Sequence, residues 1–183
     1  MSDGAETKRA PMAAAPMKYR PDGLADWGNM WDAFCVLAQE GGPPHREQML
    51  YAQVPVDVQS PAYAGVVAEL IRGIGAVSGL QAVAGPPGWV AVQCTFPVMA
   101  DWLAEAIIEE HVQARSEGAQ LLVPAGEGFE LTGEIKNVIT VVAKTTHYWQ
   151  DHLPAEVKQL LGWQLRFARA KLWITTLLRR EPI

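Results

Sequence analysis

The stretch LQAVAGPPGWVAVQC, residues 80–94, predicts a β-hairpin. Two strand-like runs, Leu80 to Ala84 and Trp89 to Cys94, flank the sequence Gly85-Pro86-Pro87-Gly88. Glycine and proline clusters between apolar runs are typical of turns. Because a tight turn joins only antiparallel strands, the hairpin indicates an antiparallel sheet.

Helical patterns lie on both sides of this hairpin. Ser60 and Pro61 supply a hydroxyl cap and a proline at the first helical position, and an apolar stripe follows at helical spacing. Pro97 opens a second helix that runs toward Gly118, and residues 119–123 form a short apolar strand. The two stripes consist of Val66, Val67, Leu70, Ile71 and Ile74, and of Met99, Leu103, Ala106 and Ile107.

A further strand is predicted over residues 50–58, where valines alternate at positions 54, 56 and 58. Pro55 restricts this strand to a sheet edge or shortens it. Residues 50–124 then follow the order strand, helix, strand, strand, helix, strand. This order predicts an α+β fold with a ferredoxin-like four-stranded antiparallel sheet, covered on one face by two helices.

The ends of the chain add helices to this core. Residues 1–20 lack a hydrophobic period and are predicted to be a disordered tail, and residues 21–183 are predicted to form a single α+β domain. An N-terminal helix starts after Asp26 and ends at Gly41-Gly42.

Residues 134–180 are expected to form a helical extension of two helices. Residues 134–153 are rich in β-branched side chains, which favour strands, but their apolar positions follow helical spacing, and we select the helix. The last helix, from about residue 155 to 178, carries two apolar strips, one containing Leu161 and the other Leu160 and Trp163. One strip is expected to meet the domain and the other a partner; a helix enclosed within one chain explains the pattern equally well.

The formal net charge of −5 conceals an asymmetry. Residues 21–153 carry five basic against sixteen acidic side chains, whereas residues 154–183 carry six basic against two acidic ones. An acidic body argues against nucleic acid as a partner, because lysine and arginine supply that affinity. The basic end is expected to neutralise the body of its own chain or of a neighbouring copy.

Several classes of protein are excluded by what the sequence lacks. No apolar run approaches the length of a membrane span, and no signal peptide is recognisable, so a cytoplasmic location is expected. Cys35 and Cys94 have no metal-ligand spacing, and no phosphate-binding or dinucleotide motif occurs. We therefore predict no metal site and no cofactor.

The strongest polar group lies on the helix predicted over residues 134–153. His147 and Asp151 stand at i and i+4, the spacing of an acid–base pair or of two metal ligands. Lys144 or Lys136 would hold an anionic substrate or ligand beside them. A solvated face of an amphipathic helix is the alternative interpretation of the same residues.

Two further groups are candidates for binding. His45 and Arg46 follow a Gly- and Pro-rich loop and are predicted to contact an anionic ligand. Seven tryptophans are many for this chain, and tryptophan is enriched at interfaces. The predicted interface residues are Trp102, Trp163, Leu165, Phe167 and Trp173.

Together these features favour a non-catalytic cytoplasmic binding or assembly protein. It is expected to form a homo-oligomer through its C-terminal helix, and a small-ligand site at the subunit interface is compatible with that assembly. The alternative is a small-molecule enzyme in which His147 and Asp151 act as the acid–base pair on an anionic substrate.

Overall fold

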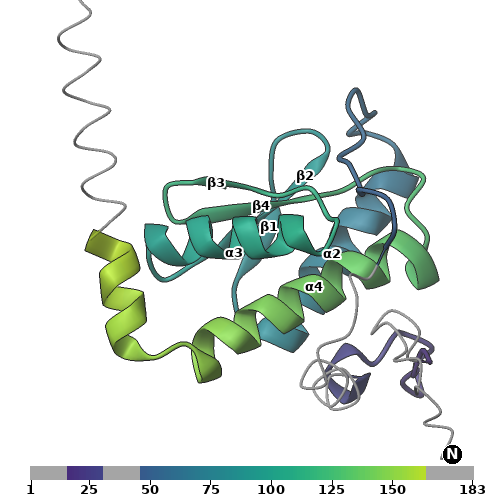
Figure 1. The fold of residues 1–183 in the computed structure, drawn as a ribbon. Coiled ribbons are helices and arrows are strands. Elements are labelled where there is room, and N and C mark those ends of the chain that lie inside the picture. The colour runs from purple at the N-terminus through teal and green to yellow at the C-terminus, as the bar shows by residue number, and fades with distance from the viewer. Residues whose placement is uncertain (1–15, 31–45, 164–183) are drawn as a thin grey trace, which may run out of the picture.

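The computed structural model describes residues 16–30 and 46–163 (Figure 1). Helix α2 (Pro61–Ser78) leads into the hairpin β1 (Ala82–Ala84) and β2 (Trp89–Gln93). Helix α3 (Pro97–Glu109) then precedes a second hairpin, β3 (Arg115–Glu117) and β4 (Gln120–Pro124).

One continuous helical stretch follows β4. It consists of the π-helical turn η2 (Leu131–Ile135), helix α4 (Lys136–His147) and the π-helical turn η3 (Tyr148–His152). The prediction of a helix over residues 134–153 is therefore confirmed. Its apolar stripe outweighs the β propensity of its valines and threonines, because that stripe is buried in the main core against α2 and α3.

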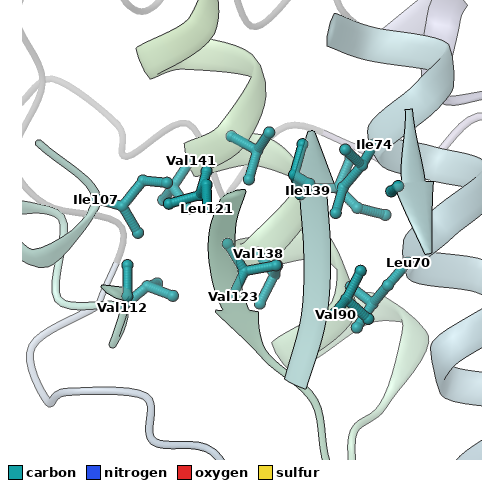
Figure 2. Packing of buried hydrophobic residues seen from close by; sticks show 14 of the residues in the cluster. Leu70, Ile74, Val90, Ile107, Val112, Leu121, Val123, Val138, Ile139 and Val141 are labelled. Carbon is teal, nitrogen blue, oxygen red and sulfur yellow. The ribbon is translucent and has the colours of Figure 1, made fainter. Parts of the chain in front are cut away.

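The four strands pair in the order β1-β2-β4-β3, and every neighbouring pair is antiparallel. Alternation along β2 and β4 directs Val90, Val92, Leu121 and Val123 into the main core. Figure 2 shows side chains of α2 and α4 meeting these strands. Helix α4 therefore lies at the centre of the molecule, packed against both α2 and α3.

The opposite face of the sheet has its own small cluster. Trp89, Ala91 and Leu122 are buried there, and Ala52 packs against them. The guanidinium carbon of Arg115 lies 4.6 Å from the centre of the Trp89 ring, a cation–π contact that covers this cluster from the edge strand.

The α+β class is confirmed, but the expected ferredoxin-like order is not. The strand predicted over residues 50–58 is wrong, since only Leu50 makes an isolated parallel bridge, to Val112. Its alternating valines do not line a buried face: Val54 and Val58 are exposed. Strand β3 was not predicted, because its sequence Arg-Ser-Glu is polar and its pairing depends on the turn at Gly118, where φ is +62°.

The N-terminal residues that the structure describes are attached to α2. Residues 27–30 are helical, and Asp26 accepts a hydrogen bond from the backbone of Asn29, as expected of a helix cap. The indole of Trp27 donates to Glu69 at 2.8 Å. Within the predicted tail, Tyr19 bridges Ala25, and residues 1–15 lie outside the described part of the chain.

Candidate functional site

Helix α4 is buried on almost every side, including its polar residues. Lys136 is 5% exposed and Thr140 is 0% exposed, so the solvated face suggested by the sequence does not exist at these positions. The buried polar residues of the helix are Lys136, Asn137, Thr140, Thr145 and Thr146.

The three buried threonines of α4 differ in how their hydroxyl groups are satisfied. Thr145 donates to the carbonyl of Val141 at 2.8 Å. The hydroxyl oxygens of Thr140 and Thr146 have no hydrogen-bond partner within the part of the chain that the structure describes. An unsatisfied buried hydroxyl costs about 1–3 kcal/mol, so these two hydroxyl groups lower the stability of the folded chain.

Lys136 lies one turn before Thr140 and therefore on the same side of α4. Burial lowers the pKa of its ammonium below the ordinary value of 10.5, because the charged form loses its hydration. Of the two described residues predicted to bind a ligand, Lys136 is thus nearly inaccessible.

Arg46 is the second described residue that was predicted to bind a ligand, and it is half-buried near the start of the long helix. Its guanidinium lies 3.6 Å from a carboxylate oxygen of Glu134. Burial opposes ionisation of Glu134, but the backbone N–H of Glu130 and the nearby Arg46 outweigh it and lower the pKa of Glu134. The structure thus brings Arg46 and Lys136 to the same end of the helix, while His45 lies outside the described residues.

The predicted pair of His147 and Asp151 is present at the other end of α4. Nδ1 of His147 lies 2.8 Å from Oδ2 of Asp151. Nε2 of His147 lies 3.3 Å from Nε2 of His152, a residue that the sequence did not single out. In the tautomer that donates its Nδ1–H to Asp151, Nε2 of His147 is the acceptor atom and faces His152.

The turn η3 is what brings the two histidines together. In an α-helix, residues five apart point in directions about 140° apart. A π-turn closes a hydrogen bond across five residues, and here the backbone N–H of Leu153 donates to the carbonyl of Tyr148 at 3.0 Å. Because i, i+5 spacing is meaningless on an α-helix, nothing in the sequence pattern could reveal this contact.

Aromatic rings surround the histidine pair. Trp102 of α3 stacks on Tyr148, with ring centres 6.0 Å apart and planes 8° apart, and also contacts Trp149. Tyr148 in turn contacts His152 at 5.6 Å. Trp102, predicted as an interface residue, therefore packs within its own chain and holds η3 against α3.

Lys144, predicted to hold a substrate, forms an ion pair with Glu110 of α3. Both side chains are largely covered, at 21% and 15% exposure. An ammonium engaged in this way ties α4 to α3, and an anionic substrate would have to compete with Glu110 for it.

The predicted interface is described only in its first turns. Residues 155–163 are helical; Leu160 and Trp163 are each 59% exposed, whereas Leu161 packs against the main core. Leu165, Phe167 and Trp173 lie outside the described residues.

Cys94 is buried, and desolvation raises the pKa of its thiol to about 11, so the side chain stays protonated and inert at neutral pH. Over residues 16–30 and 46–163, no group of three or more His, Cys, Asp or Glu side chains is placed to hold a metal ion. None of the described helices combines the length and the apolar character needed to cross a membrane. Comparison of the chain with protein-family models and with curated proteins gave no match.

Proposed function

We propose that the protein is a non-catalytic, cytoplasmic assembly protein that forms a homo-oligomer through its C-terminal helix. The observation that carries this proposal is the division of the helix over residues 155–163. Leu161 packs against the protein's own core, whereas Leu160 and Trp163 are exposed to solvent. Exposed apolar side chains at helical spacing on a second strip are what a helix-to-helix contact requires.

Charge supports a second copy as the occupant of this strip. The segment 154–183 is basic and the body of the chain is acidic, so the helix of one copy complements the body of another. A small-ligand site at the subunit interface, with Arg46 and Lys136 as candidate binding residues, belongs to the same proposal. Lys136 is buried, so the residues that cover it would have to move before it could bind a ligand.

Size-exclusion chromatography with light scattering tests the assembly. The full chain at micromolar concentration is expected to elute as an oligomer, and Leu160→Asp together with Trp163→Ala to shift it to monomer. Tyr51→Asp is the matched control, because Tyr51 is 62% exposed and lies on another segment, before α2. A monomeric wild type, or an oligomer unaffected by the double substitution, overturns the proposal.

A second candidate function, a small-molecule enzyme, is favoured by the contact of His147 with Asp151. The carboxylate fixes the imidazole tautomer, and Nε2 is left as the proton acceptor. In a screen of small anionic substrates, turnover lost in His147→Gln and reduced in Asp151→Asn would support it. Turnover that both variants retain would exclude this pair as its catalyst.

A further inference from the structure

We propose that His147 and His152 form a binding site for a divalent first-row metal ion of the zinc type, with Asp151 orienting the first ligand. The site lies outside the assembly strip and does not depend on oligomerisation. It departs from the absence of a metal site predicted from sequence, because the π-turn that builds it was not predictable.

The separation of the two imidazoles carries the proposal. Zinc binds histidine nitrogen at about 2.0–2.1 Å, and tetrahedral geometry then places two ligand nitrogens about 3.3–3.4 Å apart. The Nε2 atoms of His147 and His152 are 3.3 Å apart. The same contact also meets the distance criterion of an N–H···N hydrogen bond, and the titration below separates a bound ion from a shared proton.

The carboxylate of Asp151 supplies the second contact that such sites have. Histidine ligands almost always donate their other ring N–H to a carboxylate, a carbonyl or water, which fixes the ring and raises its basicity. Asp151 receives Nδ1–H of His147 at 2.8 Å, so Nε2 is the coordinating atom. His152 coordinates through Nε2 once its ring proton resides on Nδ1.

The surroundings leave both histidine rings accessible to an ion from solvent and restrain the turn that carries them. The side chain of His147 is 25% exposed and His152 is exposed, so an ion can reach both nitrogens from solvent. Tyr148 contacts the ring of His152 and is itself stacked on Trp102, which restrains the turn. Two protein ligands leave coordination positions open for water or a small anion.

Backbone geometry explains why the two histidines are adjacent. The turn η3 closes the C-terminal end of the long helix, where Leu153 already has an extended backbone. The turn η3 is the element that changes the relation of residues 147 and 152 from divergent to adjacent. An ion bridging the two rings would stabilise this turn.

Isothermal titration of the metal-free full chain with Zn²⁺ tests the site. We expect one ion per chain, lost in His147→Gln and in His152→Gln, and an affinity about 10- to 100-fold weaker in Asp151→Asn. His111→Asn is the control that removes a histidine from another described part of the chain. Its φ of +59° is one that asparagine tolerates, and this variant should bind as the wild type does.

Circular dichroism at the same temperature should show that the variants remain folded, as expected for changes at accessible positions. Wild-type protein that takes up no Zn²⁺ overturns the proposal. So does uptake that persists in the double variant of His147 and His152, because the ion would then be held by other residues.

Discussion

Thr140 and Thr146 place hydroxyl groups in a core that offers them no partner among the described residues. At such a position a methyl group is better than a hydroxyl, because the desolvation cost disappears and the volume is kept. Thr140→Val is expected to raise the free energy of unfolding by about 1 kcal/mol, measured by urea denaturation.

Thr145→Val is the control for this change, since it removes the hydrogen bond to Val141 and should lower the free energy of unfolding by about 0.5–1.5 kcal/mol. A loss of stability in Thr140→Val as large as in Thr145→Val would show that the Thr140 hydroxyl is bonded after all.

Lys136 makes stability depend on pH in the alkaline range. Its pKa is lowered by burial, so between that pKa and 10.5 the unfolded chain binds more protons than the folded one. The free energy of unfolding therefore increases as pH rises through this interval. Below the interval, the full cost of burying the charged ammonium destabilises the folded chain.

The measurable quantity is the difference in the free energy of unfolding between the wild type and Lys136→Met. It should increase from neutral pH toward 10.5, and the comparison with Lys136→Arg, which stays charged throughout, should show the same trend. A difference that does not change with pH would contradict a desolvated ammonium at this position.

At the scale of elements, α2 and α4 approach closely at a glycine. A Cβ added at Gly73 would collide with Ile139, coming within 2.9 Å of its Cγ1, and would lie 3.1 Å from Cδ1 of Trp27. The absence of a side chain here lets three segments share one contact, since Trp27 belongs to the N-terminal residues and Ile139 to α4. Close packing of this kind leaves little room for relaxation.

Gly73→Ala is expected to lower the free energy of unfolding by about 1 kcal/mol, because an overpacking cost of about 1–3 kcal/mol exceeds the gain in helix propensity of about 1 kcal/mol. Gly65→Ala in the same helix meets nothing within 4 Å and should be stabilising by about 0.5–1 kcal/mol. Adding Ile139→Val should relieve part of the Gly73→Ala cost in a double-mutant cycle. Equal effects of the two alanines would exclude the steric explanation.

At the scale of the whole molecule, the proposed assembly links stability to concentration. A partner that binds only the folded chain raises the thermal midpoint as protein concentration increases. The thermal midpoint of the wild type should therefore be higher at higher protein concentration. Leu160→Asp should abolish that dependence. Tyr51→Asp should retain it, and a concentration-independent wild type would contradict assembly through residues 155–163.

The local sequence pattern was sufficient to predict the elements that bury an apolar stripe or are bounded by glycine and proline. The hairpin around Gly85 to Gly88, helices α2 and α3, and the long helix containing α4 all follow from hydrophobic period and from glycine and proline positions. The i, i+4 relation of His147 and Asp151 followed as well, because it depends on helix geometry alone.

Tertiary packing decided the rest. Residues 50–58 have a strand pattern but form only the isolated bridge of Leu50 with Val112. Strand β3 has no such pattern but is paired through its turn, so the order of the sheet could not be deduced from the sequence. Burial of Lys136 and Thr140 depends on what surrounds α4, which helical period does not report. The meeting of His147 with His152 depends on a π-turn, whose extra residue per turn changes which side chains are adjacent. Sequence determined which segments are helical or extended, because that depends on neighbours along the chain, whereas the site depends on neighbours in space.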